Sequence, residues 1–195
     1  HKYHLCSDDV CDYHLYSIAD NKSPQLSADR LEYTLGNLYN YGFCSLKQIK
    51  NFYDHLIIGI NEYNEQEIMF DDLRIAEEFN DIAFKTFHVY IADADRFSMQ
   101  TLADLIQYCI NHHILTYDDL YTTESNIINK IKNNEDSYKL WNRYVDYKQV
   151  IICKEYQKDW IYVHVKKRYI DAYVHHIGRL SMHSSIIKER IKELK

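Results

Sequence analysis

The sequence predicts a mainly α-helical (α+β) fold, in which a helical body is followed by a small C-terminal antiparallel β hairpin and a terminal helix. Three observations predict this fold. The 195 residues include only one proline and four glycines, which favours long regular elements over a many-stranded sandwich. Apolar residues recur at helical spacing along most of the chain. β-Branched and aromatic runs occur together only late, between residues 150 and 165.

The first two well-marked helices are expected after Pro24, which interrupts a polar N-terminal stretch with a hint of a short helix. Ser27 can cap the first helix, and Gly42 can end it in the left-handed conformation. The second helix is predicted to begin at Ser45 and to continue to Ile60. The apolar stripes are Ala28, Leu31, Leu35 and Leu38 in the first, and Leu46, Ile49, Phe52, Leu56, Ile57 and Ile60 in the second.

Three more helices are predicted in the middle of the chain. Asp71 and Asp72 lie where a helix dipole favours acidic side chains, ahead of a third helix over residues 73–87. Ser98 is expected to cap a fourth helix that reaches Cys109. Residues 116–132 are predicted to form a turn followed by a helix that carries three isoleucines.

The pattern changes after residue 133, so we predict a helical body over residues 1–133 and a small α+β lobe over residues 134–195. A short helical piece around Trp141 precedes the lobe's strands. Val150–Cys153 and Trp160–Val165 have the composition of two strands of an antiparallel hairpin. A last helix is predicted over Ser185–Leu194.

Composition excludes several classes of protein. The net charge of −6 provides no clustered positive surface for nucleic acid, and the late basic residues are interpreted as solvated side chains. No apolar run is long enough to span a membrane, and no signal peptide is recognised. The five cysteines are widely spaced without a C-x-x-C pair, so reduced, mostly buried thiols and a cytoplasmic protein are expected.

Residues 27–33 read Ser-Ala-Asp-Arg-Leu-Glu-Tyr, and this is the most informative segment of the chain. It resembles a motif of the HD-domain metal-dependent phosphohydrolases, in which the aspartate is the last metal ligand. Residues 95–99, 118–120, 167–171 and 178–181 resemble later segments of that family. The resemblance implies that this chain is the C-terminal part of an HD domain.

The resemblance also implies roles for four residues of the first helix. Asp29 would bind a divalent metal (Mn, Mg, Fe, Ni or Zn), which activates water and neutralises phosphate in such sites. Arg30 would contact phosphate and Tyr33 the sugar or base of a nucleotide substrate. Asn37 would lie on the same side as Asp29 and Tyr33, because the three are spaced by four residues. The parent protein would then hydrolyse a phosphorylated substrate.

Two departures from the family pattern support an alternative. Gly36 and Asn37 stand where the family often has an Arg-Asp pair, and no His-Asp dipeptide occurs in the sequence. The remaining metal ligands would therefore have to lie outside these residues, and the segment alone is expected to be inactive. The alternative is a non-catalytic helical interaction module, a degenerate HD relative whose many tyrosines contact protein partners, including further copies of itself.

Overall fold

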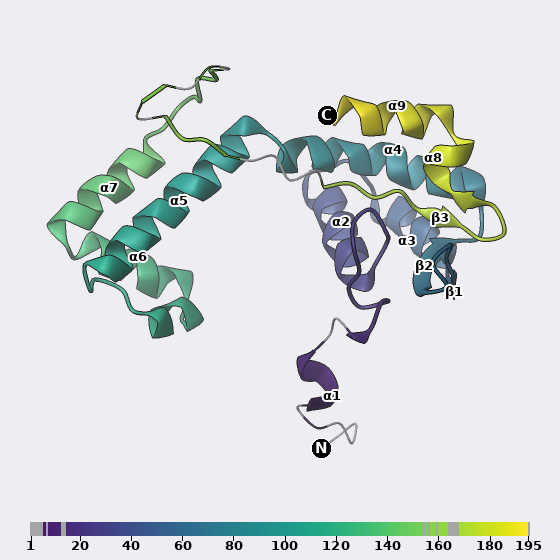
Figure 1. Cartoon of the computed structure of the whole chain (residues 1–195), viewed down its shortest axis with the longest axis horizontal. Helices are drawn as coiled ribbons and strands as arrows, with labels where there is room; N and C mark the ends of the chain where they lie inside the picture. The colour runs from purple at the N-terminus through teal and green to yellow at the C-terminus, as the bar shows by residue number, and fades with distance from the viewer. Residues whose placement is uncertain are drawn as a thin grey trace. The chain divides into compact units, whose positions relative to one another are not determined.

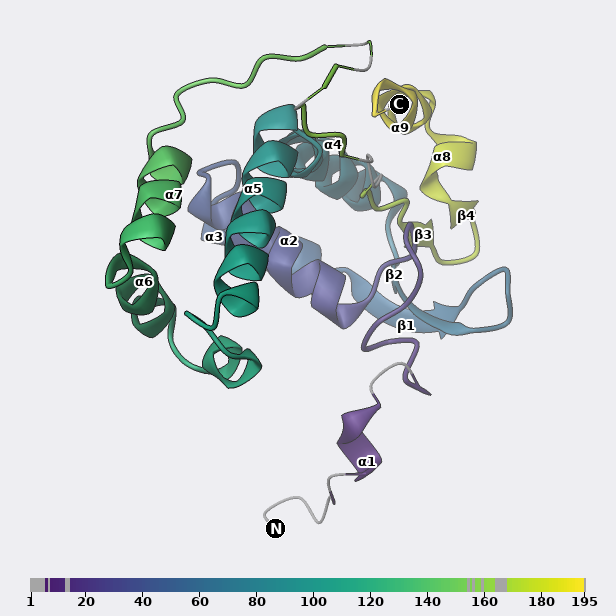
Figure 2. The same ribbon diagram turned by 60° about the vertical axis from the view of Figure 1, so that its left-hand side comes forward.

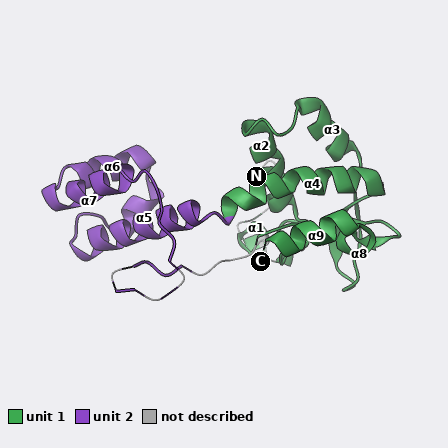
Figure 3. Cartoon of the chain, turned by 90° about the horizontal axis from the view of Figure 1, so that it is seen from above, with its two compact units in different colours: residues 1–90, 167–195 green, residues 91–166 purple. Residues whose placement is uncertain are grey.

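A computed structural model describes residues 6, 8–12, 15–153, 155, 157–158, 160–163 and 168–194. The structure confirms a mainly helical fold with one small sheet (Figure 1). The chain forms two compact units, which Figure 3 colours separately. Unit 1 comprises residues 1–90 and 167–195, and unit 2 comprises residues 91–166.

These units divide the chain at other points than the boundary expected after residue 133. The physical reason is a long-range pairing that no local pattern reveals. Strand β3 (Tyr173–Val174) pairs in parallel with β2 (Gln66–Phe70), about a hundred residues earlier in the chain. The last segment thereby becomes part of the N-terminal unit.

Unit 1 combines helices with the four-stranded sheet, whose strand order is β1-β2-β3-β4. Strands β1 and β2 form one antiparallel hairpin, and β3 and β4 form a second. Helix α9 packs on α4 and α8, and α2 packs on α3 and α4 (Figure 1). The remaining elements are α1 (Asp8–Cys11), α2 (Ala28–Asn40), α3 (Leu46–Asp54), β1 (Leu56–Ile60), α4 (Leu73–Tyr90), β4 (Gly178–Arg179), α8 (Leu180–His183) and α9 (Ser185–Glu193).

Helix α2, which carries the predicted site, forms as its sequence predicts. The Ser27 hydroxyl accepts a hydrogen bond from the Arg30 N–H and caps the helix. Leu31, Leu35 and Leu38 are buried on one face, against α4. Gly42 follows the helix with φ of 72°, a left-handed conformation that glycine adopts without strain.

The second predicted helix is wrong over its last third, because α3 ends at Asp54 and β1 begins at Leu56. The apolar residues 56, 57 and 60 fit helical spacing, but the same residues also suit a strand. Strand β2 decides between the two by pairing with all five residues of β1, from Leu56 opposite Phe70 to Ile60 opposite Gln66. The helices α4 and α9 agree with the prediction, and the Asp72 carboxylate accepts from two N–H groups at the start of α4.

Unit 2 is a bundle of helices connected by short turns. Figure 2 shows α6 and α7 side by side, next to α5. Its core consists of Leu105, Cys109, Leu115 and Ile131, all nearly inaccessible to solvent. The elements are α5 (Asp93–Asn111), the 3₁₀ helix η2 (Tyr117–Tyr121), α6 (Glu124–Lys132) and α7 (Glu135–Val145).

Two predictions about unit 2 are wrong. Helix α5 begins at Asp93 rather than at Ser98, which lies inside the helix. The hairpin expected over residues 150–165 is absent from the described part, because 150–153 and 160–163 contain no strand, while residues 164 and 165 lie outside the described residues. Ile151 and Ile152 are 70% and 66% exposed, so they lack the packed surface that makes β-branched residues stable in a sheet.

No helix in the described residues combines the length and the apolar character needed to span a membrane. None of the five cysteines forms a disulfide in the structure. Only Cys44 and Cys109 are buried, and burial raises the pKa of both thiols. Cys6 and Cys11 are exposed, so the expectation of mostly buried thiols is wrong for these two.

Candidate functional site

Asp29 lies in the first turn of α2 with its side chain exposed. Its N–H donates to the Ala19 carbonyl oxygen at 3.2 Å, which fixes the backbone. The carboxylate forms no hydrogen bond or ion pair with any residue that the structure describes. The positive end of the helix dipole favours a carboxylate here, and the exposed side chain is open to a ligand.

Arg30 holds the preceding loop in place. Its guanidinium donates to Asn21 Oδ1 at 2.7 Å, to the Asn21 carbonyl oxygen at 2.8 Å and to the Gln25 carbonyl oxygen. The Asp20 carboxylate Oδ1 lies 3.8 Å from Arg30 Nη2 and forms an ion pair with it. The Arg30 side chain is only 13% exposed. Most of its hydrogen-bond donors are therefore occupied within the protein, which leaves little of the group for a substrate phosphate.

Tyr33 and Asn37 share a partner on α4. The Asn37 side-chain amide donates to the Tyr90 hydroxyl at 2.5 Å, and the Tyr33 and Tyr90 rings pack edge to face with centroids 6.2 Å apart. Partial burial raises the pKa of Tyr33 above its usual value, against a smaller opposing effect of Arg30. The helix thus brings Tyr33 and Asn37 to one face, as their spacing predicts.

A divalent metal needs several protein ligands that converge on one point. The residues that the structure describes contain no group of three or more His, Cys, Asp or Glu side chains arranged to hold a metal ion. Asp29 can thus supply one ligand, and the described residues do not fit a complete metal site.

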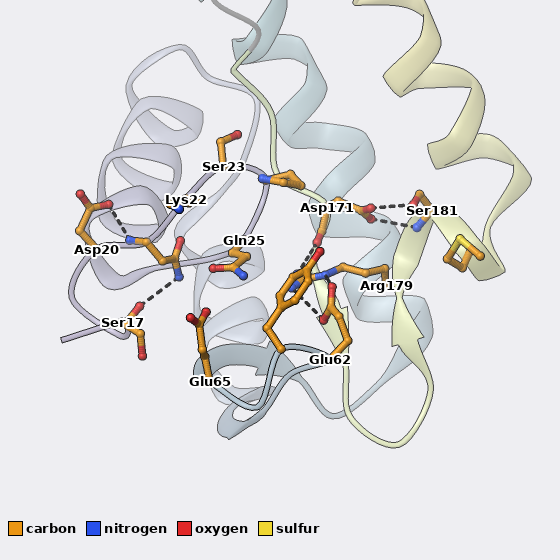
Figure 4. Close-up of a pocket in the computed structure, with 14 residues that line it drawn as sticks. Ser17, Asp20, Lys22, Ser23, Gln25, Glu62, Glu65, Asp171, Arg179 and Ser181 are labelled. Carbon is orange, nitrogen blue, oxygen red and sulfur yellow. Dashed lines mark hydrogen bonds and ion pairs between the residues drawn. The ribbon is translucent and has the colours of Figure 1, made fainter. Parts of the chain in front are cut away.

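A separate pocket of about 860 Å³ lies within unit 1, and sequence patterns gave no sign of it (Figure 4). Three segments far apart in the chain form its walls: the loop before α2, the β1–β2 turn and the region around β4. Hydrogen bonds join these segments, because Asp171 N–H donates to the Pro24 carbonyl oxygen at 2.9 Å and Ser23 Oγ donates to the Tyr169 carbonyl oxygen at 3.0 Å. No local sequence pattern can indicate this pocket, because it depends on contacts between residues nearly 150 positions apart.

Arg179 forms the charged centre of this region. It donates to Glu67 at 2.6 and 2.7 Å and to Glu62 at 2.8 and 3.1 Å. Glu67 is fully buried and also accepts from the Leu26 N–H and the Asn61 side chain. Burial alone would lower the pKa of Arg179, but its hydrogen bonds with the two glutamates raise it above the usual range. The guanidinium therefore stays charged and holds the N- and C-terminal parts of unit 1 together.

The C-terminal segments that resemble the HD family meet in this pocket. Asp171 accepts hydrogen bonds from the N–H and the hydroxyl of Ser181, at 2.9 and 2.6 Å. Both residues line the pocket together with Arg179 (Figure 4). These hydrogen bonds join Asp171 to Ser181, and the bond from the Asp171 N–H to the Pro24 carbonyl oxygen joins them to the loop that precedes Asp29.

Comparison with known proteins yields one relative. The chain is 26% identical over 140 residues to a Bacillus subtilis (strain 168) protein described as "uncharacterized protein YdhJ". The match covers 70% of this chain and 40% of YdhJ, so the chain spans less than half the length of that relative. No protein-family model matches the chain, and no solved structure matches it. The comparisons assign neither a family nor an activity.

Proposed function

We propose that this chain is the C-terminal part of a metal-dependent phosphohydrolase of the HD type. The phosphorylated substrate of that enzyme would be a nucleotide. One observation carries the proposal: Asp29 is held at the start of α2 with a carboxylate that no described residue engages. The resemblance of residues 27–33 to the HD motif gives this open carboxylate the role of a metal ligand. The cysteines, none of which is in a disulfide, are consistent with a cytoplasmic protein.

The residues around Asp29 suggest how this part of the chain would contribute. Tyr33 and Asn37 follow Asp29 at successive turns of the helix and are fixed by Tyr90, so they form a rigid wall beside it. A bound metal would supply an activated water and neutralise phosphate charge. The other ligands would come from outside the described residues, so the segment by itself is expected to be inactive.

The test compares Asp29→Ala with Glu32→Ala in the complete protein that contains this chain. Glu32 is an exposed acid on the same helix and serves as the matched control. Bound metal and the release of phosphate from nucleotides are measured for both. We expect Asp29→Ala to reduce metal binding and phosphate release by at least about 100-fold, because a metal ligand is lost. Glu32→Ala should leave metal binding and phosphate release unchanged. Full metal content and activity in Asp29→Ala would show that Asp29 is not a ligand.

A second candidate function is a non-catalytic interaction module that binds further copies of itself. An apolar groove in unit 2 favours it, since Ile151, Ile152 and Trp160 are all exposed there. Light scattering on the wild type and on Ile151→Asp tests this candidate. A dimer that Ile151→Asp converts to a monomer supports it, and a monomeric wild type argues against it.

A further inference from the structure

The pocket in unit 1 has an excess of negative charge. Four acidic and two basic side chains line it. The acidic ones come from all three walls, and Figure 4 shows them spread around the pocket rather than gathered at one point. They are Asp20, Glu62, Glu65 and Asp171.

The basic side chains offset this charge only in part, although Arg30 pairs with Asp20 and Arg179 with Glu62. Arg179 is already paired with Glu62 and with the buried Glu67, so two carboxylates surround one guanidinium. Asp171 receives its hydrogen bonds from the uncharged groups of Ser181. Lys22 and Glu65 are both exposed, so water screens their two opposite charges alike. An anion such as phosphate would be repelled, and a cation would be attracted.

Gln25 provides an independent sign of a ligand. The residue is only 8% exposed, yet its side-chain amide has no hydrogen-bond partner among the described residues, although the backbone groups of Gln25 are paired. In Figure 4 its side chain lies between the loop of Asp20 and Lys22 and the Arg179–Glu62 pair. The Gln25 amide atoms are not among the fully buried unpaired atoms of the described residues, so they are reached from the pocket, where a ligand or water completes their hydrogen bonds.

The arrangement distinguishes an organic cation from a metal ion. The described residues hold no cluster of three potential metal ligands, so the acids of the pocket do not converge on one point. A volume of about 860 Å³ is far larger than a metal ion requires and lies within the usual range for small-molecule sites. Pro24 and Met182 add apolar surface for a hydrocarbon stem.

We propose that this pocket binds a small organic polyamine. Its ammonium groups pair with the Glu65 carboxylate and with the other acidic side chains of the pocket. One ammonium group also donates to the Gln25 amide oxygen. Glu65 is suited to this role, because its carboxylate is exposed and has no partner among the described residues. The site is separate from Asp29 and does not depend on phosphohydrolase activity.

Calorimetric titration of the full chain with spermidine at low salt tests the proposal. We expect saturable binding that weakens as salt is added, because the attraction is electrostatic. Glu65→Gln should weaken binding by about three- to fivefold, as for an exposed ion pair. Glu78→Gln, an exposed acid on α4 outside the pocket, is the matched control and should bind as the wild type does.

Gln25→Met provides a sharper test, since methionine is similar in shape and lacks the amide. The free protein should keep or gain stability, because no protein hydrogen bond is lost. Spermidine binding should fall by about tenfold or more, as for a lost hydrogen bond to a charged group. Asp29→Ala should leave spermidine binding unchanged, which separates this site from the proposed function.

Three results would overturn the proposal. The first is no saturable spermidine binding by the wild type at low salt. The second is equal binding by the wild type, Glu65→Gln and Gln25→Met. The third is binding of inorganic phosphate or Ca²⁺, but not spermidine, that Glu65→Gln weakens, because it would assign the pocket to a different ligand class. If Gln25→Met fails to fold, the comparison of Glu65→Gln with Glu78→Gln still decides.

Discussion

In unit 1, buried polar groups join segments more than a hundred residues apart, whereas the core of unit 2 consists of apolar side chains from neighbouring helices. The Arg179–Glu67 pair connects positions 112 residues apart and is almost inaccessible to solvent. In unit 2 the core residues all fall between Leu105 and Ile131. The difference indicates that unit 1 adds charged contacts of specific geometry to a large apolar core, whereas unit 2 depends on packing that local sequence already favours.

The largest expected effect follows from breaking the buried pair of unit 1. Arg179→Ala leaves the carboxylate of Glu67 fully buried without its cation, which costs about 3–5 kcal/mol of unfolding free energy. Arg190→Ala is the control, because its pair with Asp81 is roughly half exposed and is worth less than about 1 kcal/mol. Urea unfolding followed by circular dichroism measures both.

Tryptophan fluorescence makes this test specific to one unit. The chain has two tryptophans, Trp141 and Trp160, and both belong to unit 2. Arg179→Ala should therefore shift the dichroism transition and leave the fluorescence transition in place. An equal shift of both signals would show that the two units unfold together. A loss of unfolding free energy no larger than that of Arg190→Ala would contradict the stabilising role of the buried pair.

A slightly smaller effect is expected from a cavity in unit 2. Leu115 is 1% exposed within the apolar core, so Leu115→Ala should cost about 2–5 kcal/mol. The fluorescence transition should now move, in contrast to Arg179→Ala. Leu120→Ala serves as the control, since Leu120 is 41% exposed and should matter little. Equal urea midpoints for the two variants would contradict the assigned core.

The smallest effect concerns pH and a surface carboxylate of unit 2. Asp119 accepts from Lys130 Nζ at 2.6 Å and from the N–H and hydroxyl of Thr116, and these hydrogen bonds, that of Lys130 first, lower its pKa. Because the pKa of Asp119 is lower in the folded state, its ionised carboxylate stabilises unit 2 fully at any pH above the pKa of the unfolded state, about 4. This stabilisation is lost as the pH falls through the pKa of the folded state.

Asp119→Asn provides the measurement. The wild type should exceed the variant in the stability of unit 2 at neutral pH, and the difference should shrink as the pH falls below about 4. Tryptophan fluorescence during urea unfolding reports it at each pH. Asp118→Asn, at the exposed neighbouring acid, is the control. A difference between wild type and Asp119→Asn that grows toward acid pH would contradict the assigned role of Asp119.

Part of the candidate site could be predicted from local sequence. Helix α2 and the common face of Tyr33 and Asn37 follow from helical spacing and the Ser27 cap. The engagement of Arg30 with the loop before the helix could not be predicted, because an arginine has several carbonyl and carboxylate partners within reach. The unpartnered amide of Gln25 could not be predicted either, because the burial of Gln25 depends on segments far away in the sequence.

Strands show the same limit. Residues 56–60 form a strand although their spacing also fits a helix, and residues 150–153 form none although their composition suits one. Of these two segments, β1 pairs with a neighbouring strand, and such pairing stabilises a pleated segment. Strands β3 and β4 are two residues long, too short for any periodic signal.

The sequence by itself determined the helical class, most helix positions, the α2 cap and the exposed Asp29, because each depends on residues within a few positions of one another. Tertiary structure alone decided the strand pairing, the two units, the Arg179–Glu67 contact and the acidic pocket around Gln25. The pocket and the Arg179–Glu67 contact arise where residues 17–25, 62–67 and 169–182 meet. Their energies come from burial and from hydrogen bonds between distant groups, which no local pattern of residues records.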